Sequence, residues 1–145
     1  MLSQKDTTLP KPTLYKFEDV KPRLDELPEG KSYIKAWIST HNSTSMTGGL
    51  NFLNNASVPW HLTVDEIVYC LQGQFRLVVE NEDGTQDSYT LDPGDVIWMP
   101  KGMHIRYESD EKCVIFYAVH PVDWKQQQGI TFVPGLDPND PIKPR

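Results

Sequence analysis

The side chains best suited to chemistry lie in the middle of the chain: His61, Glu66 and His104. Glu66 is followed at once by the apolar run 67–71, so we expect it on a buried strand with little water around it. A carboxylate in such a place must find a hydrogen-bond partner or a cation, or take up a proton. Either outcome makes Glu66 a candidate general acid or base.

His61 precedes Glu66 by five residues. An imidazole can act there as a metal ligand or as the partner of Glu66 in proton transfer, and the family resemblance given below implies that His61 lies in the same pocket. A plainer interpretation makes His61 an ordinary strand histidine bonded to a backbone carbonyl, and Glu66 a salt-bridge partner of Arg76 or Arg106. Glu66 and His61 are the predicted catalytic residues.

His104 is the third potential metal ligand. Its phase matches Arg106 and Glu108, which should face solvent, so we expect it to point outward unless the preceding turn is irregular. Most catalytic metal sites use three protein ligands, and His61, Glu66 and His104 form the predicted set. If a divalent metal binds, mixed nitrogen and oxygen ligands would suit Zn, Fe, Ni or Mn.

Four further residues are predicted to contact a small-molecule ligand. Tyr107 has the phase of Ile105, so both are expected on the pocket side of their strand, and Tyr107 is an alternative third metal ligand. Trp60 lies beside His61. Tyr69 completes the set, although packing between sheets is the commoner role of an aromatic residue in an apolar strand.

The elements that must position these residues are strands. Short apolar or alternating segments are separated by turn signals every 8 to 12 residues, among them the D-G dipeptide within 81–85. The clearest expected strands are 33–38, 50–53, 66–71, 74–80 and 113–119, with a short one near 14–17 and a turn of helix near 23–27. The run 66–71 is typical of a strand buried on both sides. About nine or ten strands of this kind predict a sandwich or barrel.

Two blocks carry a known pattern. P-W-H-L-T-V-D-E-I-V-Y-C-L-Q-G spans 59–73, and P-G-D-V-I-W-M-P-K-G-M-H-I spans 93–105. They resemble the two signature motifs of the cupin superfamily, which implies an all-β double-stranded β-helix, the jelly-roll cupin barrel. Of the metal ligands in the family pattern, the resemblance keeps only His61 and Glu66 in place.

Within the cupins, the region 46–124 looks most like the C-terminal domain of EutQ-type ethanolamine-utilisation proteins. The shared features are P-W-x-L-x-x-D-E-I, G-D-V before P-K-G, and the segment F-Y-A-V-H-P-V-D-W at 116–124. The resemblance implies the fold and a pocket containing Glu66. It differs at His61, where the family usually has Thr, and we do not find the residues that the acetate kinase role attributed to the family would require.

Composition and length narrow the class of protein. With 145 residues, the chain is expected to form one cupin domain over 13–124, between a flexible arm at 1–12 and a Pro-rich tail at 125–145. The net charge of −6 excludes nucleic acid as a partner, since that binding needs clustered Lys and Arg. No run of about 18 apolar residues predicts a membrane span, and no signal peptide is evident, so a cytoplasmic location is expected.

Together these features predict a small cupin enzyme of lyase, isomerase or dehydratase type, acting on a small polar metabolite in the barrel. Glu66 and His61 would transfer protons, with or without a metal. The alternative is a non-catalytic cupin that binds or senses a metabolite through a degenerate metal site. A homodimer is expected, with the segment 14–17 as the pairing strand.

Overall fold

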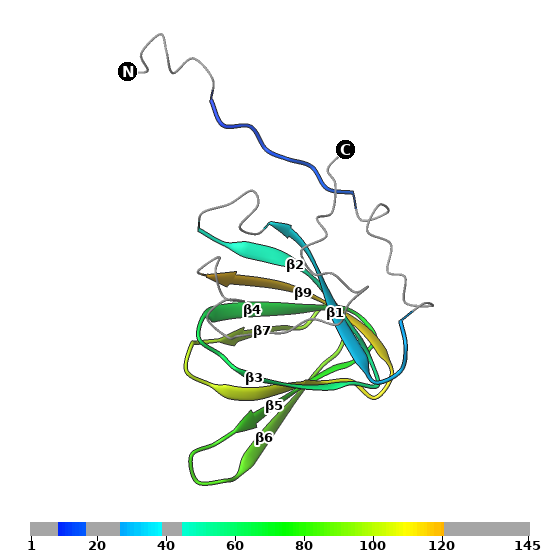
Figure 1. Cartoon of the computed structure of the whole chain (residues 1–145), viewed down its shortest axis with the longest axis vertical. Coiled ribbons are helices and arrows are strands. Elements are labelled where there is room, and N and C mark those ends of the chain that lie inside the picture. Colours follow the sequence, from blue (N-terminus) through cyan, green and yellow to red (C-terminus); the bar gives the residue numbers. More distant parts are fainter. Residues whose placement is uncertain (1–8, 17–26, 39–44, 121–145) are drawn as a thin grey trace.

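The computed structural model describes residues 9–16, 27–38 and 45–120. Nine strands are present in these ranges (Figure 1). They are β1 (Lys31–Ile38), β2 (Thr47–Asn54), β3 (Ser57–His61), β4 (Asp65–Gln72), β5 (Phe75–Glu80), β6 (Gln86–Leu91), β7 (Val96–Met99), β8 (His104–Glu108) and β9 (Lys112–His120). The described part of the chain contains no helix, and so none that could cross a membrane.

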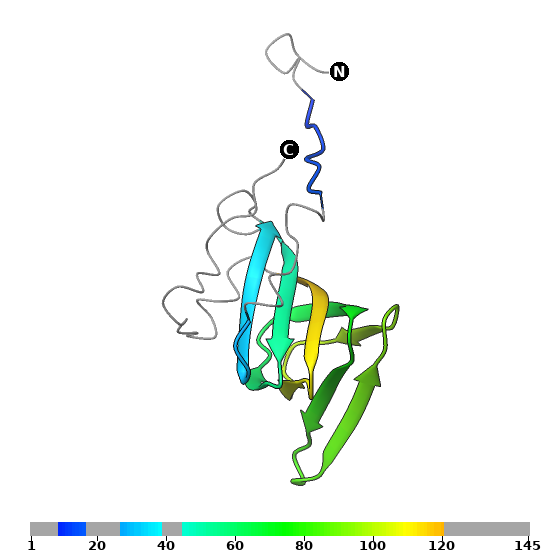
Figure 2. The same cartoon turned by 90° about the vertical axis from the view of Figure 1, so that its right-hand side faces the viewer.

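The strands form two antiparallel sheets. One sheet has the order β1-β2-β9-β4-β7, and the other has the order β3-β8-β5-β6. Chain neighbours such as β3 and β4 lie in different sheets, so the chain crosses repeatedly from one layer to the other (Figures 1 and 2). This arrangement confirms the predicted jelly-roll cupin fold.

The main core fills the space between the sheets. It follows from the period-two pattern of the strands, because residues at alternate positions face the same side. In β5 the buried residues Phe75 and Leu77 alternate with the half-exposed Arg76, and Leu77 lies opposite Tyr107 of β8. Cys70 and Cys113 are both buried in this core as free thiols.

A tight turn joins β4 to β5 across the two layers. Gly73 has a φ of +73°, which residues with a side chain rarely adopt. A Cβ at this position would lie 2.3 Å from the carbonyl oxygen of Lys112 in β9. Both constraints require glycine here, and the turn fixes where β5 enters the second sheet.

The prediction that 66–71 is buried on both faces is wrong. Burial alternates along β4, and Ile67 and Tyr69 are 41% and 37% exposed on the outer face. The cause is position in the sheet: β4 lies next to β7, the last described strand, and no further layer of the described chain covers its outer side as it would in a parallel sheet. Only the inner face of β4, which carries Glu66, is enclosed.

Further toward β2, the outer face of the same sheet is covered. Leu27 packs there on Leu50, Phe52 and Val114 in a second apolar cluster. The nearby residues 14–16 form no strand, so the strand predicted there is not found in its described part, and the helical turn predicted at 23–27 falls mainly outside the described residues. Most of the predicted arm and all of the predicted tail also lie outside them.

Candidate functional site

A small hollow opens between the two sheets, with about 10 Å³ of space for the centres of water-sized molecules. Its described lining comes from six strands and the β3–β4 connection. The lining residues are Ile34, Asn51, Trp60, Leu62, Glu66, Tyr107 and Tyr117. The wall is therefore mostly apolar and aromatic, with a few polar groups, as in many small-molecule sites.

Glu66 and Tyr107 join the two sheets at this hollow. Glu66 lies on the inner face of β4, opposite the buried residues Met99 and Val119 of the flanking strands. Tyr107 reaches it from β8 in the other sheet, and its hydroxyl donates a hydrogen bond to Glu66 Oε1. Only 6% of Glu66 is exposed to solvent. A buried carboxyl group is thus held in a fixed position by a phenol.

Burial changes the acidity of this carboxyl group. Loss of hydration raises the pKa of Glu66 from 4.5 to about 7, and the hydrogen bond from Tyr107 offsets only part of that rise. The predicted alternative, a salt bridge to Arg76 or Arg106, is wrong. Those two side chains pair on the outer face of β5 and β8 with Glu80, Glu108 and Asp110. Near neutral pH, Glu66 therefore exists in both its acid and its base form.

The two tyrosines of the hollow, unlike Glu66, do not titrate near neutral pH. Burial raises the pKa of Tyr107 and of Tyr117 above the usual value of 10, and the nearby Glu66 raises both further. Both phenols consequently stay protonated at physiological pH and act as hydrogen-bond donors. Glu66 is left as the group in the described lining that gains or loses a proton near neutrality.

Aromatic packing shapes the remaining wall. The Trp60 and Tyr107 rings meet edge to face, with centroids 6.1 Å apart and planes at 69°. Behind them, Phe75 packs on Tyr107 with centroids 5.2 Å apart. Opposite, the Asn51 side-chain oxygen accepts a hydrogen bond of 2.8 Å from Ser32. These contacts hold the polar and aromatic groups in defined orientations.

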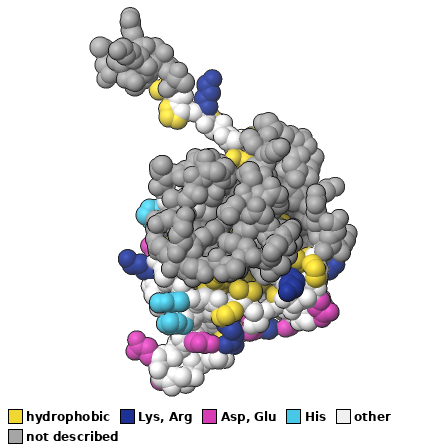
Figure 3. Space-filling view, viewed as in Figure 1, with side chains coloured by type: hydrophobic (Ala, Val, Ile, Leu, Met, Phe, Trp, Pro, Cys, Tyr) yellow, Lys and Arg dark blue, Asp and Glu magenta, His cyan; other side chains and the backbone are white. Residues whose placement is uncertain are grey.

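The predicted place of His61 in the pocket is wrong. In the β3–β8 pair, Trp60 lies opposite Ile105 and His61 opposite His104, so the two pairs face opposite sides of the sheet. The first pair points inward, and both histidines are exposed. Their rings stack outside, with centroids 4.2 Å apart and planes at 10°. Figure 3 shows histidine side chains gathered on the surface there. The outward direction expected for His104 is confirmed.

The three predicted metal ligands therefore do not point toward one site. Glu66 points into the hollow, while His61 and His104 point away from it. In the ranges that the structure describes, no three His, Cys, Asp or Glu side chains are grouped so that they could hold a metal ion. The described residues thus do not fit the divalent metal that the cupin resemblance implies.

Two of the four residues predicted to contact a ligand lie in the lining of the hollow. Trp60 and Tyr107 line the hollow, whereas Ile105 is buried in the core beside it and Tyr69 lies on the outer face of its sheet. Sequence reasoning missed Asn51. Its signal was a polar residue within an otherwise apolar strand segment, 50–53.

The comparison with protein families shows which family the chain belongs to. Residues 14–126 match the family described as "Ethanolamine utilisation protein EutQ". The chain belongs to the EutQ family. Among curated EutQ relatives is the "Acetate kinase EutQ" of Clostridioides difficile strain 630, which is 25% identical over 100 residues, covering 69% of this chain and 60% of the relative. The corresponding Escherichia coli K12 protein is 31% identical over 88 residues, covering 61% and 36%.

The chain thus spans less than two thirds of the length of these EutQ relatives. Among solved structures, the C. difficile EutQ protein is similar with a TM-score of 0.60 and 26% identity, over 79% of each chain. A cupin superfamily protein from Desulfitobacterium hafniense shares the fold, with a TM-score of 0.55 and 16% identity over 68% and 87% of the chains. So does the oxalate decarboxylase of Bacillus subtilis, which has Mn(II) centres (TM-score 0.57, 23% identity, 84% and 33% covered).

Proposed function

We propose that this EutQ-family cupin binds a small metabolite in the hollow between its sheets and that Glu66 transfers a proton to or from it. The observation that carries the proposal is a carboxyl group with a pKa of about 7, enclosed in a pocket and fixed by Tyr107. A general acid or base works best when its pKa lies near the working pH. Glu66 meets that condition without help from His61.

The composition of the pocket narrows the type of reaction. The phenols of Tyr107 and Tyr117 have raised pKa values, so they donate hydrogen bonds but do not titrate near pH 7. With one titrating group, a single-base reaction fits best: Glu66 removes a proton from one atom of the substrate and returns it to a neighbouring atom. Of the predicted reaction types, this favours an isomerase.

We do not extend the acetate kinase activity named for the relatives to this pocket. Phosphoryl transfer needs cationic groups or metal ions that stabilise the charge on the phosphoryl oxygens. No Lys or Arg is among the described residues that line the hollow. A non-catalytic module that binds a metabolite through Glu66, Asn51 and Tyr107 is the second candidate, favoured by the absence of a second titrating group in that lining.

Hydrogen exchange tests the catalytic proposal across a range of candidate substrates. The protein is incubated in D₂O with a panel of small polar metabolites that carry a hydrogen next to a carbonyl group, and loss of that proton signal is followed by NMR. We expect exchange with at least one metabolite, which Glu66→Gln abolishes and Glu82→Gln, at an exposed position, retains.

The outcomes separate the two candidates. Exchange that persists in Glu66→Gln would refute the role of Glu66. If no metabolite exchanges, yet one shifts the indole signal of Trp60 in a way that Glu66→Gln removes, the protein is a binding module and the catalytic proposal is wrong.

A further inference from the structure

Outside the hollow, the two histidines of the β3–β8 pair lie together on the surface. His61 and His104 are directly opposite each other in the register of the two strands. Both side chains are exposed, and their rings stack with centroids 4.2 Å apart. Histidine is the commonest metal ligand in proteins, so two imidazoles side by side on a sheet are a candidate metal site of their own.

The hydrogen-bond pattern of the two strands brings these side chains close. The backbone amide of Leu62 donates to the carbonyl oxygen of Met103 at 2.8 Å, so the next pair along the strands occupies a non-hydrogen-bonded position. That pair is His61 and His104. The Cβ atoms of residues directly opposite each other are about 4.5–5.5 Å apart, and they are closer in non-hydrogen-bonded pairs. The sheet therefore holds the two histidines at its shortest cross-strand spacing.

The rings can reach a shared ion without movement of the backbone. Their planes are nearly parallel, at 10°, so the lone pairs of the ring nitrogens, which lie in those planes, run side by side. Two imidazole nitrogens that bind one ion, each at about 2.1 Å, lie roughly 3 Å apart. The ring centroids are 4.2 Å apart, so the distance left to close is small. Because both rings are exposed, they can close it by turning about their side-chain bonds.

The neighbouring charged groups on this face are already paired. Glu80 lies opposite His104 on the other side of β8. Its carboxylate accepts a hydrogen bond of 2.6 Å from Arg106, and a second carboxylate, that of Glu108, bonds the same guanidinium at 3.1 Å. The positive charge of Arg106 is therefore balanced locally, and it does not oppose a cation at the histidines.

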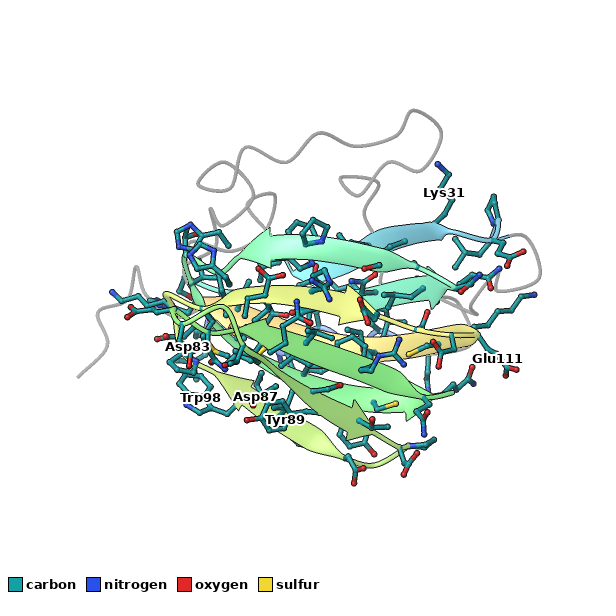
Figure 4. The ribbon with its side chains drawn as sticks, turned by 90° about the horizontal axis from the view of Figure 1, so that it is seen from below. Lys31, Asp83, Asp87, Tyr89, Trp98 and Glu111 are labelled. Atoms are coloured by element: carbon teal, nitrogen blue, oxygen red, sulfur yellow. The ribbon has the colours of Figure 1, made fainter. Side chains whose placement is uncertain are left out.

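The position of the pair in the sheet also favours a cation. Figure 4 shows Asp83, in the turn after β5, and Glu111, just before β9, at opposite ends of the molecule. His104 lies opposite the last residue of β5, so the histidines are at the Asp83 end. The segment 80–87 at this end has four acidic residues and no Lys or Arg. Its negative potential attracts cations, most strongly at low salt.

We propose that His61 and His104 bind one divalent late transition-metal ion, such as Ni²⁺, Cu²⁺ or Zn²⁺, on the outer face of β3 and β8. Imidazole nitrogen suits these ions, whereas Mg²⁺ and Ca²⁺ prefer oxygen ligands. No third His, Cys, Asp or Glu of the described residues joins the pair, so water completes the coordination. This site lies outside the barrel and does not use Glu66, so it is independent of the proposed function.

A bound ion clamps β3 to β8. The same two strands carry Trp60 and Tyr107 on their inner faces, where both line the hollow. The folded chain presents the two imidazoles together, whereas in the unfolded chain they are separated by a long stretch of sequence. The ion therefore binds the folded state more tightly and stabilises it.

Nickel chloride is the probe, added at pH 7.5 to the full chain without a histidine tag. The ring signals of the four histidines are followed by NMR while paramagnetic Ni²⁺ is added in substoichiometric amounts. We expect the signals of His61 and His104, assigned with His61→Ala and His104→Ala, to broaden first and together. Magnesium chloride at the same concentration, which supplies the same charge, should leave them unchanged.

Calorimetric titration measures the stoichiometry and the affinity. We expect one Ni²⁺ per chain, and a loss of affinity of at least about tenfold in either single variant, because the second nitrogen is held at a high effective concentration. His120→Ala, which removes an exposed histidine at the end of β9, is the matched control and should bind within about twofold of the parent. Nickel should raise the Tm of the parent and of His120→Ala, but not that of His61→Ala.

Three results would overturn the inference. The first is an affinity that falls by less than about tenfold in His61→Ala or His104→Ala, which would mean that the two rings do not share an ion. The second is equal binding of Mg²⁺, which would show that charge alone attracts the ion. The third is nickel binding that persists in both variants and disappears in Glu66→Gln, which would place the ion in the hollow. Circular dichroism checks that the variants fold, as expected for changes at exposed positions.

Discussion

Replacing Glu66 by Gln tests the energetic consequence of its burial. The folded state holds the pKa of Glu66 at about 7, against 4.5 for an ordinary Glu. Between these values the folded protein binds a proton that the unfolded chain has released, so stability falls as pH rises. Each unit of pKa difference corresponds to 1.36 kcal/mol, which gives about 3 kcal/mol over the whole window.

Gln has nearly the same shape and can still accept the hydrogen bond from Tyr107, but it cannot ionise. The parent protein loses stability as the pH rises, whereas Glu66→Gln does not titrate at this position. The difference in free energy of unfolding between the variant and the parent should therefore grow by about 2 kcal/mol in favour of the variant from pH 5.5 to pH 7, with little further change above pH 7. For a domain of this size, this is a rise in Tm of roughly 4 to 8 °C.

Urea unfolding of both proteins at half-unit steps from pH 5.5 to 8.5 provides the free energies of unfolding. Glu82→Gln controls for the loss of one negative charge in a protein of net charge −6. Parallel stability curves for the parent and Glu66→Gln would refute the reasoning, because they would mean that the carboxyl group titrates alike in the folded and unfolded states.

Three further predictions concern the surroundings of Glu66. Tyr107→Phe should raise the pKa of Glu66 above 7, since it removes the hydrogen bond that lowers it; an NMR titration that finds the pKa unchanged or lowered would contradict this assignment. The double change His61→Ala and His104→Ala should leave the pKa of Glu66 unchanged in the same titration, because both rings lie outside the hollow, and a shifted pKa would count against that orientation. Cys70 and Cys113 should not react with a disulfide reagent at pH 8 until urea unfolds the protein, since both are buried and the pKa of Cys113 is raised to about 12; rapid labelling of the folded protein would be the contrary result.

The fold could be predicted from the sequence because its strands are short, alternate regularly and end at strong turn signals. The segment 74–80 shows this most clearly: its alternating apolar residues Phe75 and Leu77 are buried in the core, and Val79 packs against it. The burial of Glu66 was predicted from the apolar run 67–71 that follows it, although that run was wrongly expected to be covered on both faces. Local pattern and global fold agree at these places.

The direction of His61 could not be taken from the family pattern, although the sequence contained the decisive signal. Val58, Trp60 and Leu62 alternate as apolar residues, which turns His61 to the opposite face. A shift of one residue reverses every side chain of a strand, so the motif alone placed the imidazole on the wrong side.

The exposure of Ile67 and Tyr69 could not be predicted from the sequence for another reason. An apolar run such as 67–71 looks the same whether a second layer or water covers its outer face. Only the strand order, which puts β4 beside the outermost described strand, shows that Ile67 and Tyr69 are exposed. Asn51 was missed similarly, because its place in the lining of the hollow depends on pairing between strands distant in the chain.

The most direct test of the central claim is the pKa of Glu66 itself. The side-chain carboxyl carbon of Glu66 is followed by ¹³C NMR from pH 4 to 9, and its signal is assigned by its loss in Glu66→Gln. We predict a single titration with a pKa of about 7, caused by burial in the hollow. A value near 4.5 would show that water reaches the group, and it would contradict the proton-transfer role on which the proposed function rests.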